Sequence, residues 1–332
     1  MQNELFESFD RVLTDFELPR LIRALEANAD DKTIWSLINE SGFLDALVPE
    51  AQGGAGLGWR EAWGVLFAAG RHGLPLPVAQ TVFGRALLCQ LGVATPEGAL
   101  SMAGWASRGL DGGLSARHVQ GLLLSSKVIV QDHDTIYLLA VDQAQVESVG
   151  GAGSFDGHAH WPSAVVNSCV VGSAERDLVA HGLALGLAVQ MAGVADRLLT
   201  MTLNYANDRA QFGKPIGKFQ AVQQQITEMA ELVYGARMAS QLGCNVEGWQ
   251  PAAVPSALAK SQNSAVAGRV ASIAHAVHAA IGVTYEYDLQ LYSRRLYEWA
   301  RTGGGADYWA GKIGHAAQSR ENLLDFVREA VF

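Results

Sequence analysis

YANDRAQFGKPIGKFQAVQQQITEM, residues 205–229, joins two apolar helical patterns through a short cationic turn. Gly213, Pro215 and Gly217 interrupt the helical pattern, because proline lacks an N–H group and glycine adopts backbone angles that other residues avoid. The segment therefore predicts two helices connected by a hairpin with hydrogen-bond donors at its tip.

The donors of this turn are Arg209, Gln211 and Lys214, and the ring of Phe212 lies among them in the sequence. Cationic donors beside an aromatic ring suit an anionic, partly aromatic ligand such as a nucleotide cofactor. An ordinary charged loop between two helices is the alternative interpretation of the same residues.

Segments on both sides of the turn carry apolar residues at the alternating three- and four-residue steps of bundle helices. These residues are Leu187, Met191, Val194, Leu198, Met201 and Tyr205 before the turn, Val222, Ile226, Met229, Val233 and Ala236 after it, and Val266, Val270, Ile273 and Val277 in a third helix. A fourth helix is expected over residues 306–328. The sequence thus predicts a C-terminal four-helix bundle over residues 173–332.

The rest of the chain divides into two regions that differ in amino-acid composition. Residues 1–96 carry apolar residues at helical spacing, such as Phe6, Phe9 and Leu13, and predict an N-terminal helical domain. Residues 97–172 are richer in glycine, serine and short β-prone runs, which predicts a small central β-domain. Its strands are expected at residues 122–124, 127–131, 135–141 and 164–171, with a hairpin turn at 132–134. The expected fold is therefore mainly α.

Composition limits the partners and the compartment. The formal net charge of −9 argues against general nucleic-acid binding, and three cysteines without a CxxC pair fit a reducing cytoplasm. The acidic N-terminus does not resemble a signal peptide, and the longest apolar run, residues 182–195, is too short to span a membrane. We expect a cytoplasmic protein without membrane insertion. The charged content of 17% predicts large buried helix contacts or an oligomer.

Self-contained catalytic motifs are missing from the sequence, which has no HExxH helix, GxSxG elbow or Walker A loop. His158 and His160 lack a third ligand at metal-binding spacing, so a surface loop is expected there and no metal site. Any chemistry is therefore expected to come from an organic cofactor that the fold positions.

With this order of elements, residues 205–229 resemble the hairpin of the acyl-CoA dehydrogenase family. Three further stretches support the resemblance: GFLDALVPEAQGGAGLG (42–58), GLPLPVAQTVFGRALLCQLG (73–92) and HAAIGVTYEYDLQLYSRR (278–295). The last stretch is similar to bacterial subunits that degrade sterol side chains and related acyl-CoA thioesters. The resemblance implies FAD as cofactor and an α,β-dehydrogenation of an acyl-CoA, in which a glutamate base removes the α-proton and the flavin accepts a hydride.

The resemblance also implies roles for the residues of the turn. Arg209 is expected to contact the pyrophosphate of an FAD held by a neighbouring subunit, and Phe212 is expected to lie near its adenosine end. Gln211, Gln220 and Gly282 complete the expected cofactor-binding set.

Several positions depart from the family pattern. Gly303 stands where the usual catalytic glutamate is expected, and Ala279 and Ala280 replace two glycines that approach the FAD pyrophosphate. The Thr-Glu-Pro type of loop and the Trp-Ile-Thr strand, which cover flavin and substrate in the family, are missing as well. The catalytic residue of this chain is therefore left unidentified.

Three functions stay open at this point. The chain is expected to be a degenerate subunit that completes the FAD site of a catalytic homologue in a dimer or tetramer, either homo- or hetero-oligomeric. One alternative is a self-sufficient dehydrogenase with a relocated carboxylate base, for which Glu286, Asp288 and Glu298 are the nearby acids. The other alternative is a non-catalytic helical scaffold that binds no flavin.

Overall fold

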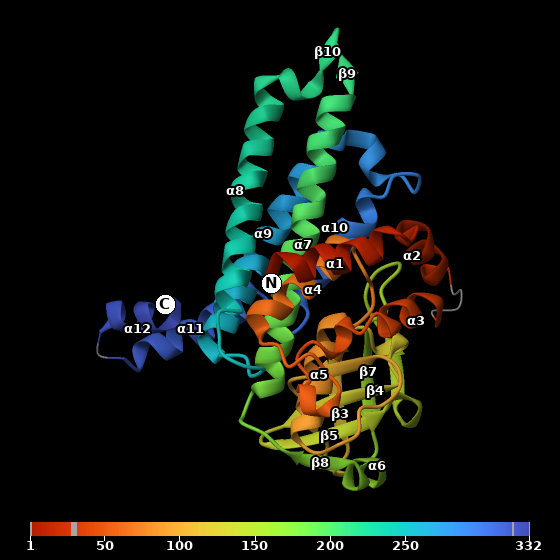
Figure 1. Ribbon diagram of the computed structural model, residues 1–332, viewed down its shortest axis with the longest axis vertical. Helices are drawn as coiled ribbons and strands as arrows, with labels where there is room; N and C mark the ends of the chain where they lie inside the picture. The colour runs from red at the N-terminus through yellow and green to blue at the C-terminus, as the bar shows by residue number, and fades with distance from the viewer. Residues whose placement is uncertain (1, 28–31, 321, 332) are drawn as a thin grey trace.

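The structure, a computed structural model, describes residues 2–27, 32–320 and 322–331. Figure 1 shows β-sheets at one end of the long axis and the small hairpin of β9 (Ala210–Gln211) and β10 (Lys214–Pro215) at the other. Helices fill the space between these two ends. The chain is thus mainly helical, as predicted, and β1 to β8 lie between two helical parts of the sequence.

The N-terminal part consists of helices α1 (Gln2–Thr14), α2 (Leu18–Glu26), α3 (Lys32–Glu40), α4 (Trp59–Arg71) and α5 (Val78–Gln90). On α1, Phe9 and Leu13 are almost completely buried, which agrees with the face predicted from their spacing. At the start of α4, the Glu61 carboxylate accepts a hydrogen bond of 3.2 Å from the backbone N–H of Gly58. This contact satisfies a donor that the first helical turn would otherwise leave free.

The central strands form two sheets of four strands each, in the orders β1-β4-β5-β8 and β2-β3-β7-β6. Their bounds are β1 (Leu100–Ala103), β2 (Ser107–Arg108), β3 (Leu114–Val119), β4 (Lys127–Asp132), β5 (Thr135–Ala140), β6 (Gln145–Ser148), β7 (Gly157–Trp161) and β8 (Val170–Ser173). β1 pairs in parallel with β4, and the other pairings are antiparallel. Residues from both sheets, including Trp161 and Val128, form one apolar cluster.

The predicted strands are partly correct. The strands expected at 127–131 and 135–141 are β4 and β5, and the turn between them is the predicted hairpin. The prediction for 122–124 is wrong, because Leu122–Leu124 is a short 3-10 turn that follows Gly121 in the left-handed region. The strand expected at 164–171 is wrong in its first part, where helix α6 (Ser163–Ser168) follows Pro162 and β8 begins only at Val170. Proline before the first turn favours a helix start over a strand.

The C-terminal part is built from the long helices α7 (Leu178–Asp208), α8 (Gln220–Gly243) and α9 (Ala253–His278). Helix α7 is the central one and contacts α4, α8, α9 and α10 (Leu289–Arg301). By length and composition α7 could cross a membrane, since the helix extends well beyond the apolar run 182–195. Its apolar window is, however, 94% buried inside the protein. It is therefore a core helix of this fold.

Glycines let α4 approach α7 closely. A Cβ atom added at Gly70 would lie 2.0 Å from the carbonyl oxygen of Gln190, and one added at Gly193 would lie 2.2 Å from that of Phe67. Both distances are far below van der Waals contact, so only glycine permits this crossing.

The helix predicted over 306–328 is wrong as a single element. The structure has α11 (Ala306–Gln318) and α12 (Leu323–Val331) instead, and Figure 1 shows both extending sideways from the bundle. The Asn322 side chain accepts a hydrogen bond of 2.9 Å from the Leu324 N–H, which starts the second helix. Helix α10 also packs on α7 and α9, so the C-terminal part contains more than the four predicted helices.

Candidate functional site

The hairpin between α7 and α8 ends in a tight turn at Phe212 and Gly213. Gln211 pairs with Lys214, and both central residues have positive φ angles, 52° and 77°. Two-residue hairpins of this kind normally place glycine, asparagine or aspartate at such positions. A phenylalanine in the left-handed region is strained, and its ring is nevertheless 91% exposed. The turn therefore displays an aromatic ring to the outside at a conformational cost.

The other predicted residues of the turn lie close to this ring. Arg209 is exposed at the end of α7, and its carbonyl accepts a hydrogen bond of 2.8 Å from Ile216, which closes the hairpin. Gln211 is exposed on β9. Lys214 is exposed as well, but its ammonium group already contacts the Phe219 ring, with 4.3 Å between the nitrogen and the ring centre. Arg209, Gln211 and Phe212 are thus brought together, with side chains that are free to meet a ligand or a partner.

Gln220 and Gly282 lie away from the tip of the hairpin. Gln220 is the exposed first residue of α8. Gly282 is buried in a 3-10 turn after α9, where an added Cβ would lie 3.0 Å from both His278 and Leu289. Close packing alone therefore accounts for glycine at this position.

Aromatic rings connect the root of the hairpin with the end of α9. The ring of Tyr205, one turn before Arg209, stacks on His278 with centroids 4.5 Å apart. Burial is the main cause that lowers the pKa of His278, so its imidazole is neutral at pH 7. After it, Ala279 adopts a positive φ of 54°. An alanine thus occupies a backbone conformation that favours glycine, at a position where the family pattern expects glycine.

The position expected for the catalytic base lies directly after α10. Gly303 has a φ of +64°, and a Cβ there would lie 3.1 Å from the Leu183 side chain. A glutamate would have to adopt this left-handed conformation and displace Leu183. The loop is therefore shaped for glycine and does not fit the base that the family pattern places there.

The side chain of Lys260 anchors the loop that contains Gly303. Its ammonium group is completely buried and donates to the carbonyl oxygens of Trp299, at 2.8 Å, and Gly304, at 2.9 Å. Burial lowers the pKa of Lys260 to about 7. The lysine connects α9 with the end of α10 and so fixes the backbone on both sides of Gly303.

Two cavities adjoin the end of α10. The first, here called the carboxylate cavity, has a volume of about 320 Å³ and contains Asp156, Glu298, Thr302 and the loop 149–154. The second, here called the cationic cavity, has a volume of about 290 Å³ and contains Arg117 and Gly303. His118 and Arg301 line both cavities. Of the predicted cofactor-binding residues, none lines either cavity.

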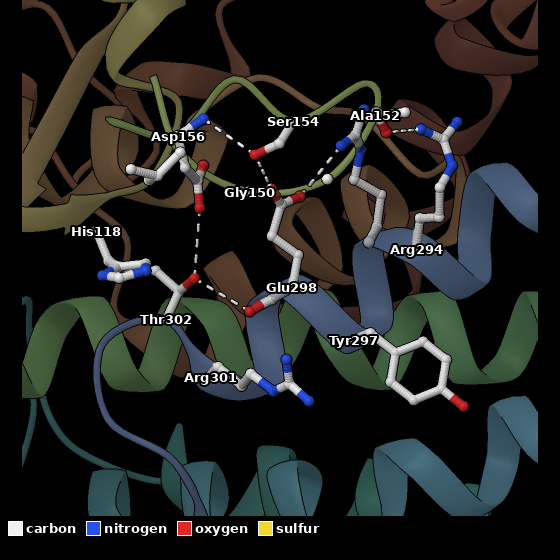
Figure 2. A pocket seen from close by; sticks show the side chains of 13 residues that line it. His118, Gly150, Ala152, Ser154, Asp156, Arg294, Tyr297, Glu298, Arg301 and Thr302 are labelled. Atoms are coloured by element: carbon white, nitrogen blue, oxygen red, sulfur yellow. Dashed lines mark hydrogen bonds and ion pairs between the residues drawn. The ribbon is translucent and has the colours of Figure 1, made fainter. Parts of the chain in front are cut away.

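Asp156 is a functional candidate that the sequence reasoning missed. Figure 2 shows it facing Thr302 across the carboxylate cavity, and its carboxylate accepts hydrogen bonds from Thr302, at 3.5 Å, and from the N–H of Gly121, at 2.9 Å. Burial and the nearby Glu298 carboxylate raise the pKa of Asp156 to about 7. A buried carboxyl that titrates near neutral pH can donate or accept a proton.

The three acids expected as a relocated base differ in their surroundings. Glu286 is exposed in the loop after α9. Asp288 forms an ion pair of 2.5 Å with Arg23. Only Glu298 lines the carboxylate cavity, where it is paired with Arg295 at 3.1 Å and hydrogen-bonded to Ser154. The structure therefore places one of the three beside a cavity, and adds Asp156 to it.

The surface loop expected for His158 and His160 is wrong, because both residues lie on strand β7, where they have local partners. His160 is hydrogen-bonded to Ser115 at 2.8 Å, and the His158 ring accepts a hydrogen bond from the His118 N–H. Over residues 2–27, 32–320 and 322–331, no three histidine, cysteine, aspartate or glutamate side chains gather in a way that could hold a metal ion.

Sequence comparison finds relatives that are described as acyl-CoA dehydrogenases. Residues 181–316 match the family model described as "Acyl-CoA dehydrogenase, C-terminal domain". Acyl-CoA dehydrogenase IpdE2 of Mycolicibacterium smegmatis is 27% identical over 271 residues, which are 80% of this chain and 82% of that protein. Acyl-CoA dehydrogenase FadE34 of Mycobacterium tuberculosis is 28% identical over 89% of this chain and 43% of its own length.

Solved structures agree on the fold. A chain of the ChsE4–ChsE5 complex from Mycobacterium tuberculosis superimposes with a TM-score of 0.84 at 23% identity, covering 97% of this chain and 98% of that chain. A chain of the Tcur3481–Tcur3483 steroid ACAD superimposes with a TM-score of 0.81 at 22% identity, covering 96% and 98%. The matched family model and the sequence relatives show that the chain belongs to the acyl-CoA dehydrogenase family, a family of FAD-dependent oxidoreductases that act on CH–CH bonds.

Proposed function

We propose that this chain is a partner subunit of an FAD-dependent acyl-CoA dehydrogenase and that its hairpin completes the FAD site of a catalytic homologue. The observation that carries the proposal is the tip of the hairpin. Arg209, Gln211 and Phe212 are exposed together at the end of the molecule farthest from its own sheets (Figure 1). A cationic fork and a flat ring are the groups that bind a pyrophosphate and an adenine.

The chain's own residues fit the cofactor poorly. Gly303 replaces the base in a loop whose φ and neighbours disfavour any side chain. Ala279 adds a methyl group at a positive-φ position where the family pattern has glycine. A bound FAD would supply the hydride-accepting chemistry. The hairpin is suited to contact an FAD that is bound mainly by another subunit.

Exposed apolar residues support association with a partner. Ile281, Val283 and Tyr285 follow α9 and are 40%, 72% and 69% exposed. Such a group of apolar side chains on one loop is typical of a protein–protein interface. Two structures with the same fold are complexes of two differently named chains, one of them described as a steroid ACAD. By analogy with the two-chain assembly and with the steroid ACAD, we propose that this chain is part of a heteromeric enzyme. This enzyme would act on a sterol- or steroid-derived acyl-CoA in the cytoplasm.

The test is to purify the chain alone and together with a co-encoded homologue, and to record the visible flavin spectrum and the acyl-CoA dehydrogenase activity of each. We expect a colourless chain alone and a yellow, active complex. A yellow chain that is active by itself would disprove the proposal. A complex that stays colourless would support the scaffold alternative.

The variant Arg209→Ala examines the role of the hairpin in the purified complex. Its FAD should bind about tenfold more weakly, because a charge-assisted contact to phosphate is lost. Lys218→Ala is the matched control, since it removes the same charge from the same hairpin at another exposed position. Equal FAD affinity in Arg209→Ala and wild type would exclude Arg209 from the site.

A second candidate function rests on the carboxylate cavity. In a self-sufficient enzyme, Asp156 or Glu298 would take the role of the base that Gly303 cannot fulfil. The raised pKa of Asp156 makes this residue a better candidate for the base than Glu286 or Asp288. Activity of the chain alone that is lost in Asp156→Asn would establish it.

A further inference from the structure

We propose that the cationic cavity binds the carboxylate of an organic acid whose apolar body lies against Met102, Trp105 and Leu183. The cavity lies between the ends of β1 and β3, the first turns of α7 and the loop after α10. It lies apart from the hairpin residues, so the inference does not depend on the proposed role of the hairpin.

The charge of the lining is the first argument. Among the residues that the structure describes, the titratable side chains that line the cavity are Arg117, His118 and Arg301, and no aspartate or glutamate is among them. The chain as a whole has a net charge of −9. A cavity with basic groups only is therefore a local feature that attracts an anion against the background of the molecule.

The second argument is that these charges are free. Within the described part of the chain, neither the Arg117 nor the Arg301 guanidinium has an ion-pair partner. Figure 2 shows the Arg301 side chain extending beside Thr302 without a dashed contact to the residues drawn around it. Both side chains are exposed enough to turn toward a bound group. A guanidinium fork of this kind binds a carboxylate through two parallel hydrogen bonds.

The nearby acids do not neutralise Arg301. Glu298, one turn before it, already pairs with Arg295 at 3.1 Å and accepts a hydrogen bond from Ser154. Asp156 accepts from the Gly121 N–H at 2.9 Å. Its pKa of about 7 leaves this carboxyl partly protonated at neutral pH. The acids of the neighbouring cavity therefore take up little of the positive charge of Arg301.

The third argument is the apolar part of the lining. Met102 and Leu183 are buried, and Trp105 is 38% exposed, with its ring edge against Tyr308 at a centroid distance of 5.0 Å. Gly303 and Gly304 add no side chains on the loop side. A small apolar skeleton can lie on this wall while its carboxylate meets the arginines. An inorganic anion would contact only the arginines of such a site and would leave its apolar wall uncovered.

The test is calorimetric titration of the full chain with octanoate, with 1-octanol as the neutral match and with free coenzyme A as a source of phosphate. We expect octanoate to bind at least about tenfold more tightly than 1-octanol. Arg301→Gln and Arg117→Gln should each weaken octanoate binding by about tenfold. Arg11→Gln changes an exposed residue of α1 that lines neither cavity, and it should leave octanoate binding unchanged.

Equal affinities for octanoate and 1-octanol would overturn the proposal, and so would octanoate binding that both arginine variants leave intact. Binding of coenzyme A that depends on Arg301, without binding of octanoate, would also overturn it and would assign the cavity to a phosphate. The two variants lie on different elements, and their thermal unfolding is compared with wild type, so loss of fold in one leaves the other decisive. If octanoate does not bind, the proposed role of the hairpin is unaffected, because the flavin-binding test depends on Arg209.

Discussion

Replacing Asp156 with asparagine should flatten the dependence of the stability on pH. In the folded chain, burial and then the Glu298 charge raise the pKa of Asp156 from 3.8 to about 7. Between these two values the folded state retains a proton that the unfolded state has released. The unfolding free energy of the wild type therefore falls as the pH rises through this window, and the contribution of Asp156 becomes constant above it.

The size of the effect follows from the width of the window. Each pH unit within it changes the unfolding free energy by about 1.4 kcal/mol. From about pH 5 to about pH 7, the wild type should lose about 2 kcal/mol from this one carboxyl, because the slope decreases as the pH approaches the folded pKa. In Asp156→Asn the amide stays neutral, and its oxygen can still accept from the Gly121 N–H. The variant should therefore lack this loss.

The assay is urea unfolding at constant ionic strength across this pH range, for wild type, Asp156→Asn and the control Asp142→Asn. Asp142 is an exposed acid of the same region, so its variant should follow the wild-type curve. The quantity of interest is the difference in unfolding free energy between wild type and variant at each pH, since contributions of other groups cancel in it. Parallel curves for wild type and Asp156→Asn would refute the argument that this carboxyl carries a proton near neutral pH.

Three further substitutions examine the packing and the buried hydrogen bonds. Gly70→Ala should destabilise the chain by about 3 kcal/mol or more, because its Cβ would meet the Gln190 carbonyl at 2.0 Å, whereas Gly311→Ala, with nothing within 4 Å, should stabilise α11 by about 1 kcal/mol. Chemical denaturation measures both, and a neutral Gly70→Ala would contradict the close crossing of α4 and α7. Lys260→Met should cost about 3 kcal/mol, since it leaves the buried carbonyls of Trp299 and Gly304 without their donor. An unchanged thermal midpoint would show that these carbonyls find other partners.

Local patterns predicted the regular elements well. The steps of three and four residues in α8 reflect one buried stripe, which is a property of consecutive residues, whereas the first half of α7 is buried on nearly all sides. The turn between β4 and β5 was likewise predictable, because a hairpin joins neighbouring segments. The strand expected at 164–171 failed because its β-branched residues outweighed Pro162, whose effect on the first turn decided for α6.

The candidate sites were predictable to different degrees. Arg209, Gln211 and Phe212 lie within four consecutive residues, so a single hairpin brings them together and the sequence was sufficient to find them. Asp156 was missed because its partners are far away in the chain: Gly121 is 35 residues distant and Thr302 is 146. An aspartate in a glycine-rich loop carries no signal of burial by itself.

The sequence by itself determined the mainly helical fold, the hairpin with its cationic and aromatic tip, and the glycine in place of the expected base. Only the tertiary structure decided which charged groups share a cavity. Asp156, Glu298 and Arg301 come from a loop before β7 and from α10. The packing of these elements places the carboxyls together and leaves Arg301 without an ion-pair partner among the described residues. The physical reason is that burial and charge–charge contact act through space, and both shift a pKa only after distant segments have excluded water from between them.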